Sequence, residues 1–199
     1  IQILTRWVIE EAMRQVAEWA RRGLHVQVSV NISADDLLSD DLAERVSNLL
    51  KLYRVPAEQL VFEITESAVM REPEHALKVL NRLRECGISL SVDDFGTGYS
   101  SLAHLKRLPV QELKIDQSFV RNLDETSEDA VIVRSTIEMS HNLGLKVVAE
   151  GVEYAHSLRL LERWHCDTAQ GYLISRPLTA VAFEAWIAKS HTSPSMLVH

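Results

Sequence analysis

The stretch ISLSVDDFGTGYSSL, residues 88–102, sets the pattern by which the rest of the chain can be interpreted. A short apolar run, 88–92, is typical of a buried strand, and two adjacent carboxylates, Asp93 and Asp94, follow it directly. A glycine-containing loop comes next, and then a short helix that we expect at 100–107. Like charges repel unless something compensates them, so this strand end indicates a functional site.

The same order of strand, polar strand end and helix recurs along the chain. Strict alternation of strands and helices predicts a mostly parallel sheet, either a doubly wound open sheet or a (β/α)8 barrel. A barrel typically takes ~250 residues, so six strand–helix units would be a barrel that lacks its first part. We expect strands at 26–32, 60–65, 88–92, 110–115, 145–149 and 168–174, and helices at 3–20, 33–53, 74–86, 100–107, 128–142, 155–164 and 180–188.

Composition narrows the class of protein. The chain has 199 residues, of which 46% are hydrophobic and 25% charged, as in one ordinary globular domain. A net charge of −7 argues against binding a nucleic acid polymer. Cys86 and Cys166 form neither a zinc signature nor a disulfide framework, and no membrane span or signal peptide is visible. We therefore expect a cytoplasmic domain without membrane contact, free or as the cytoplasmic part of a larger membrane-anchored protein.

Polar side chains mark the end of every expected strand. In a parallel β/α fold all these ends lie on one face, where active sites are built. Exposure to solvent is a sufficient explanation for Asn31 or Gln170 alone, but not for the whole set, whose acids have apolar flanks. The set is Asn31, Glu63, Asp93 with Asp94, Lys114, Glu150 and Gln170.

These residue types favour a particular chemistry. Several uncompensated acids would repel, and hard divalent cations relieve the repulsion; oxygen-only ligands indicate Mg²⁺, Mn²⁺ or Ca²⁺ rather than Zn²⁺. Two ions ~3.5–4 Å apart are usual for phosphate-ester hydrolysis, and Lys114 would add a cation beside the leaving or attacking oxygen. Residues 96–98 then indicate a mobile loop behind the metals. They also resemble a phosphate-cradling loop, but the full dinucleotide fingerprint is absent.

Six motifs taken together resemble the EAL domain, a family of bacterial phosphodiesterases that hydrolyse cyclic di-GMP. They are VNIS at 30–33, FEITES at 62–67, DDFGTGYSSL at 93–102, LKID at 113–116, VVAEGVE at 147–153 and AQGYLISRPL at 169–178. The resemblance covers about residues 3–188. It implies a modified TIM (β/α)8 barrel with one antiparallel strand, formed by a domain at 1–190 that is N-terminally incomplete, and a C-terminal tail at 191–199.

The resemblance also implies roles for individual residues. Those that match metal ligands of the family, with Asp93 bridging two ions of Mg²⁺ or Mn²⁺, are Asn31, Glu63, Asp93, Asp94 and Glu150. Those that match catalytic residues are Lys114, near the attacking water, Gln170, which orients a water, and Glu150, to which a general-base role has also been assigned. Those that match supporting residues are Glu66, which braces the DDFGTG loop, Asp116 in the pocket, and Glu153, which is similar to a substrate-contacting position.

One departure from the family pattern concerns the Glu-Ala-Leu triplet itself, which is absent. In the family it lies on the first strand, upstream of a helix like 3–20. We expect that strand and its Glu ligand to precede residue 1, so that the first strand–helix segment is missing from these residues. Truncation, or disorder of that region, explains this better than degeneration, because the downstream site residues are intact.

Three functions follow in order of preference. The first is metal-dependent hydrolysis of cyclic di-GMP to linear pGpG, which lowers this second messenger in bacterial signalling. The second is a non-catalytic cyclic di-GMP receptor, and the third an unrelated metal-dependent barrel hydrolase. The resemblance further implies a homodimer formed through this domain and sensor or GGDEF domains upstream of it.

Overall fold

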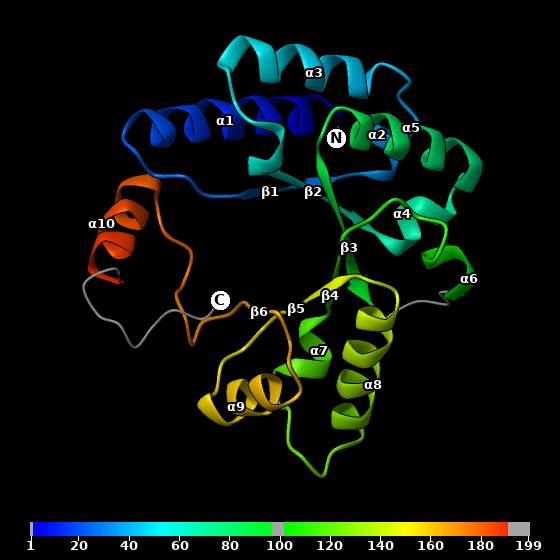
Figure 1. Ribbon diagram of the computed structural model, residues 1–199, viewed down its shortest axis with the longest axis vertical. Helices are drawn as coiled ribbons and strands as arrows, with labels where there is room; N and C mark the ends of the chain where they lie inside the picture. Colours follow the sequence, from blue (N-terminus) through cyan, green and yellow to red (C-terminus); the bar gives the residue numbers. More distant parts are fainter. Residues whose placement is uncertain (1, 97–101, 191–199) are drawn as a thin grey trace. The chain divides into compact units, whose positions relative to one another are not determined.

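The computed structural model describes residues 2–96 and 102–190 (Figure 1). The expected tail at 191–199 and most of the expected mobile loop at 96–98 lie outside the described residues. The contacts divide the chain into two compact units, 1–113 and 114–199, and each is described by itself below. All six expected strands are present. They follow one another in the order β1-β2-β3-β4-β5-β6, and the pairs β1-β2, β2-β3 and β5-β6 are parallel.

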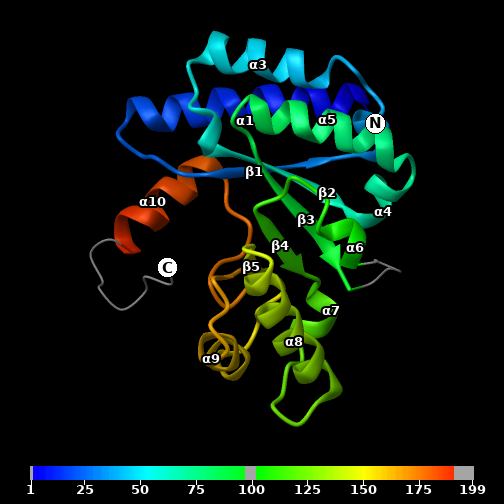
Figure 2. The same cartoon turned by 45° about the vertical axis from the view of Figure 1, so that its right-hand side comes forward.

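The first unit contains three parallel strands and the helices that cover one face of them. Helices α1, α3 and α5 lie side by side over β1 and β2 (Figures 1 and 2). The elements are α1 (Gln2–Arg21), β1 (Val28–Ile32), α2 (Ala34–Leu37), α3 (Leu42–Tyr53), the 3-10 turn η1 (Ala57–Gln59), β2 (Leu60–Thr65), α4 (Glu66–Met70), α5 (Pro73–Glu85), β3 (Ser89–Phe95) and α6 (Leu102–Leu105). Strand β4 (Glu112–Ile115) spans the boundary between the units.

The second unit contains short strands with helices around them. Helix α8 packs against α7 and β5, and β5 pairs with β6. Val133 and Ile137 from α8 and Val147 from β5 are buried in its core. The elements are α7 (Gln117–Val120), α8 (Glu128–Asn142), β5 (Lys146–Ala149), α9 (Ala155–Arg163), β6 (Thr168–Ala169) and α10 (Ala180–Ser190).

The prediction of one helix at 33–53 was wrong, because the structure has two helices there. Ser33 is the N-cap, as expected: its hydroxyl accepts from the Asp36 N–H, and its own N–H donates to the Asp36 carboxylate at 3.1 Å. The chain then leaves the helix after Leu37. The Ser39 hydroxyl donates to Asp41, the residue before α3. Local side-chain hydrogen bonds of this kind compete with helix continuation, and the Ser39–Asp41 bond lies at the break.

Other boundaries also differ from the sequence predictions. Strand β3 runs to Phe95, so Asp93 and Asp94 lie in the strand rather than after it. The strand expected at 168–174 ends at Ala169, because the chain turns at Gly171, whose carbonyl accepts from two N–H groups further along. Helices α4 and α7 were not expected. Each is about one turn long, too short to produce a helical period in the sequence.

Among the described residues, no helix combines the length and the apolar character needed to cross a membrane.

A His–Asp pair joins three segments of the second unit. The His141 ring on α8 lies 2.8 Å from the Asp167 carboxylate, and the Val147 N–H of β5 donates to the same oxygen at 2.8 Å. Burial alone would raise the pKa of Asp167, but the hydrogen bonds from His141 and Val147 outweigh it and hold that pKa below its ordinary value. The lowered pKa means that the folded unit favours the ionised carboxylate.

Asp167 should therefore stabilise the protein above its ordinary pKa of 3.8, and this contribution should be lost as the pH falls through the lowered value. We expect Asp167→Asn to lower the melting temperature at pH 7 and to matter progressively less on acidification. Melting curves between pH 3 and pH 7 measure this, with Glu162→Gln on the exposed side of α9 as the control. The same loss at both ends of the range would show that the ionised form has no such role.

Candidate functional site

One face of the three-stranded part of the first unit is polar. The register pairs Asn31 with Glu63, Glu63 with Ser91, and Thr65 with Asp93. Cross-strand partners point to the same side of a sheet, and so do residues two apart on one strand. The side chains of Asn31, Glu63, Ser91 and Asp93 therefore share one face, opposite the apolar face that includes Val30, Phe62 and Leu90.

These polar groups differ in how deeply they lie. Asn31 is exposed, whereas Glu63 and Asp93 keep only 7% and 9% of their surface. Carboxylates this buried are costly unless compensated by hydrogen bonds or a cation. Ser91 pairs with Glu63 in the register and lies two residues before Asp93 on β3. It is fully buried, and its hydroxyl has no hydrogen-bond partner among the described residues. Sequence reasoning missed Ser91, although its spacing of two from Asp93 places both on one face.

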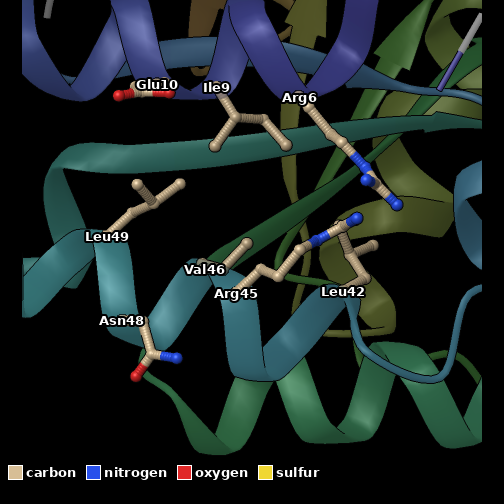
Figure 3. Close-up of a pocket in the computed structure, with 8 residues that line it drawn as sticks. All are labelled: Arg6, Ile9, Glu10, Leu42, Arg45, Val46, Asn48 and Leu49. Carbon is tan, nitrogen blue, oxygen red and sulfur yellow. The ribbon is translucent and has the colours of Figure 1, made fainter. Parts of the chain in front are cut away.

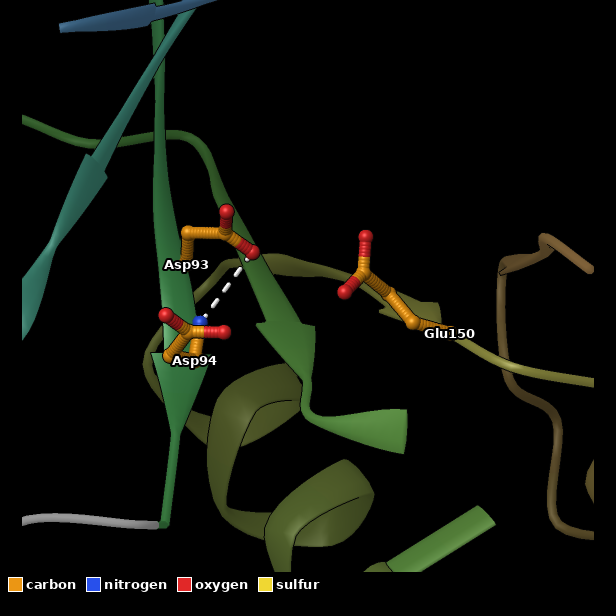
Figure 4. Close-up of side chains that lie close together, drawn as sticks. All are labelled: Asp93, Asp94 and Glu150. Carbon is orange, nitrogen blue, oxygen red and sulfur yellow. Dashed lines mark hydrogen bonds between the residues drawn. The ribbon is translucent and has the colours of Figure 1, made fainter. Parts of the chain in front are cut away.

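Asp94 has a backbone conformation that is unusual for a strand. Its φ is +55°, in the left-handed region that Asp tolerates better than most residues. Its N–H donates to the Asp93 carboxylate at 3.1 Å (Figure 4). Strict alternation would send two successive side chains to opposite faces. Here the ligand oxygens of Asp93 and Asp94 lie within 4.8 Å of each other, close enough for both carboxylates to bind a common cation.

Lys114 and Glu150 form a buried ion pair in the second unit. Lys114 lies on β4. Glu150 follows β5 directly, and its side chain is drawn in Figure 4. The Lys114 ammonium is 2.6 Å from the Glu150 carboxylate, and the two side chains are only 5% and 18% exposed. The Glu150 N–H also donates to the Ile115 carbonyl at 3.1 Å, which fixes its backbone. A buried cation is thereby held in a defined position beside a carboxylate.

The backbone of Gln170 is fixed by two hydrogen bonds, one on each side. Its N–H donates to the Ala149 carbonyl at 2.8 Å, and its carbonyl accepts from the Val152 N–H at 3.0 Å. Its side chain is exposed. The following Gly171 permits this approach, because a Cβ there would lie 2.2 Å from the Val152 carbonyl oxygen.

We expect Gly171→Ala to destabilise the protein by about 3 kcal/mol, since the Cβ would meet rigid backbone, and to lower activity by displacing Gln170. Gly144→Ala is the matched control. Its φ of +76° is left-handed, which alone strains an alanine, but nothing lies within 4 Å of the added Cβ, so it should cost only about 1 kcal/mol. Denaturant unfolding of the two variants measures the difference. Equal losses would contradict the steric explanation.

The three supporting residues take different places. Asp116 is the N-cap of α7 and accepts from the Ser118 N–H at 2.9 Å. Glu153 pairs with Arg121 at 3.1 Å; sequence reasoning did not identify Arg121, since no local pattern signals a partner so far along the chain. In the first unit, burial raises the pKa of the Glu66 carboxyl, and the charge of His104 opposes this.

Glu66 is the first residue of α4, and its Oε2 is buried with no hydrogen-bond partner in the described part of the chain. Buried polar oxygens usually have a partner. The DDFGTG loop that Glu66 was expected to brace, 93–98, includes residues 97 and 98, which lie outside the described residues, so this role stays a prediction.

Comparison with known proteins identifies the family. The sequence model of the EAL domain family matches residues 1–177. The cyclic di-GMP phosphodiesterase PA2567 of Pseudomonas aeruginosa is 37% identical over 186 residues, which cover 94% of this chain and 32% of that protein. The chain spans 23% to 32% of the length of the curated relatives it matches.

Comparison with solved structures leads to the same family. The PaMucR phosphodiesterase in its c-di-GMP complex is 40% identical, with a TM-score of 0.85 over 92% of this chain and 80% of that one. The EAL domain of Mycobacterium smegmatis DcpA is 38% identical, with a TM-score of 0.88 over 94% of this chain and 84% of that one. The chain belongs to the EAL domain family, and its fold is the TIM-barrel-like fold of that family. The family and the fold class expected from the motifs are confirmed.

Proposed function

We propose that this chain provides a metal-dependent site that hydrolyses one phosphodiester of cyclic di-GMP and releases linear pGpG. The observation that carries the proposal is the polar face of β1–β3, where Asn31 and Glu63 are paired in register and the oxygens of Asp93 and Asp94 lie within 4.8 Å. Membership of the EAL domain family, with relatives named cyclic di-GMP phosphodiesterases, supports the choice of substrate.

The residues present fit a hard divalent cation. All the donors are carboxylate or amide oxygens, which suit Mg²⁺ and Mn²⁺, and burial of Glu63 and Asp93 makes compensation by a cation favourable. The residues that would hold two ions are Asn31, Glu63, Asp93, Asp94 and Glu150, with Asp93 shared. Bound there, the ions would polarise the phosphate and lower the pKa of a water.

Three residues would act on the reacting groups. Lys114, held by Glu150 at 2.6 Å, would stabilise negative charge that develops on the phosphate or the attacking oxygen. Glu150 would accept a proton from the attacking water. Gln170, whose backbone is fixed on both sides, would orient that water through its exposed amide.

The remaining assignments concern binding and support. Glu153, positioned by Arg121, would contact the substrate, and Asp116 would line the pocket beside it. Glu66 would brace the DDFGTG loop, 93–98, which would give its buried oxygen a partner. In the whole natural protein we further propose a homodimer through this domain. We also propose sensor or GGDEF domains upstream, which the greater length of the curated relatives supports.

Product analysis tests this function. We expect the whole natural protein to convert cyclic di-GMP to pGpG when Mg²⁺ or Mn²⁺ is supplied and to stop when EDTA removes it. Anion-exchange chromatography of the reaction separates the two nucleotides. Tight binding of cyclic di-GMP with no product in either metal would contradict the proposal and identify a non-catalytic receptor.

A further inference from the structure

The Ser91 hydroxyl on β3 is buried and has no hydrogen-bond partner among the described residues. The exposed fraction of Ser91 is 0%, so bulk water does not reach this hydroxyl. The cavity between α1 and α3, which Figure 3 shows with its lining residues, does not include Ser91 either. A buried hydroxyl without a partner is unfavourable, and an alanine would fill the same position without that cost. Any partner for this hydroxyl must therefore be a side chain beside it.

The neighbours of Ser91 on the polar face of β1–β3 carry acceptor oxygens. Glu63 on β2 is its partner across the sheet, and Asp93 lies two residues further along β3. Neighbouring strands are about 4.8 Å apart, whereas two residues along one strand span roughly 6.6 Å, so Glu63 is the nearer acceptor. A carboxylate has about four lone-pair positions. Glu63 can therefore bind a cation and accept a hydrogen bond from a hydroxyl at the same time.

We propose that Ser91 is a positioning residue for the cation site. When the Glu63 carboxylate turns to bind a cation, the Ser91 hydroxyl donates a hydrogen bond to it and fixes its orientation. Carboxylates that bind metals are commonly held in this way, and loss of the supporting group typically lowers metal affinity about 10–100-fold. The hydroxyl is then satisfied only in the cation-bound protein. This inference rests on the cation site of the proposed function and adds Ser91 to it.

Ser91→Ala should act differently with and without the cation. In EDTA we expect the variant to melt at the same temperature as the unsubstituted protein or higher, because it loses a buried hydroxyl that has no partner. We expect its Mn²⁺ affinity to fall about tenfold, because Glu63 loses the group that orients it. Melting curves in EDTA, and Mn²⁺ titration followed by electron paramagnetic resonance of the unbound ion, measure the two effects on the whole natural protein.

Ser140→Ala is the matched control. Ser140 on α8 is also 0% exposed, and its hydroxyl also lacks a partner in the described part of the chain. It is not among the residues proposed to hold the cations. We therefore expect Ser140→Ala to resemble Ser91→Ala in its melting temperature in EDTA but to keep the Mn²⁺ affinity of the unsubstituted protein.

The possible results separate this inference from the proposed function. Failure of the unsubstituted protein to bind Mn²⁺ would overturn the proposed function, and the role of Ser91 with it. Normal Mn²⁺ binding by the unsubstituted protein and equal affinity in Ser91→Ala, or an equal loss in Ser140→Ala, would overturn the role of Ser91 alone. A lower melting temperature of Ser91→Ala in EDTA would also overturn it, since the hydroxyl would then have a partner before the cation binds.

Discussion

Asp93→Asn is expected to reduce cyclic di-GMP hydrolysis by the whole natural protein roughly 10³-fold or more. A shared ligand contributes to both ions, each of which supplies several kcal/mol of charge stabilisation, and 1.36 kcal/mol corresponds to a factor of ten in rate. Asn keeps the size of the side chain and its position on the polar face of β3, next to Thr65 in the register, but removes the charge. Initial rates across a range of Mg²⁺ and Mn²⁺ concentrations measure the effect.

Two comparisons make this prediction specific. The hydrolysis rate of Asp94→Asn should depend more strongly on metal concentration than that of the unsubstituted protein, because Asp94 is expected to bind chiefly the second ion. Asp129→Asn, on α8 and outside the site, should leave the rate unchanged. Near-normal turnover of Asp93→Asn would exclude the two-metal site.

Lys114→Met is expected to lower the rate about 10²-fold or more while leaving cyclic di-GMP affinity within about tenfold. A group that acts mainly in the transition state affects turnover more than binding. Met keeps most of the aliphatic stem of a side chain that is 5% exposed, so the cavity left behind is small. Calorimetry in Ca²⁺, whose looser coordination is expected to slow turnover, gives the affinity.

Lys114→Met also removes the ammonium group that pairs with Glu150, and breaking a buried ion pair can cost about 3–5 kcal/mol of stability. A melting curve and the affinity measurement together establish that the variant is folded. Lys106→Met, at an exposed position, is the control. Turnover equal to that of the control would show that Lys114 has no catalytic role.

The sequence predicted the parts of the fold that repeat. Strand 60–65 and helix 128–142 have the predicted bounds, because both have long apolar patterns with clear start and stop signals. Helices α4 and α7 were missed, since a single turn held by a cap such as Thr65 or Asp116 leaves no period. The length of strand β6 was overestimated, because the apolar run 172–174 follows a turn at Gly171, where the Val152 backbone leaves no room for a Cβ.

For the site, the sequence indicated which residues matter but not how they are arranged. The position of Asn31 and Glu63 at the ends of their strands identified them in the sequence, and the register of the sheet pairs them. The left-handed φ of Asp94 could not be predicted from two adjacent Asp residues. Neither could the 2.6 Å contact of Lys114 with Glu150, because both features depend on long-range packing rather than on local pattern.

The most direct test of the central claim is the number of Mn²⁺ ions bound per chain in the presence of cyclic di-GMP, measured by electron paramagnetic resonance titration of the whole natural protein. The account predicts two bound ions in a spin-coupled pair, and loss of the pair in Asp93→Asn. Binding of no Mn²⁺, or an unchanged spin-coupled pair in Asp93→Asn, would contradict it.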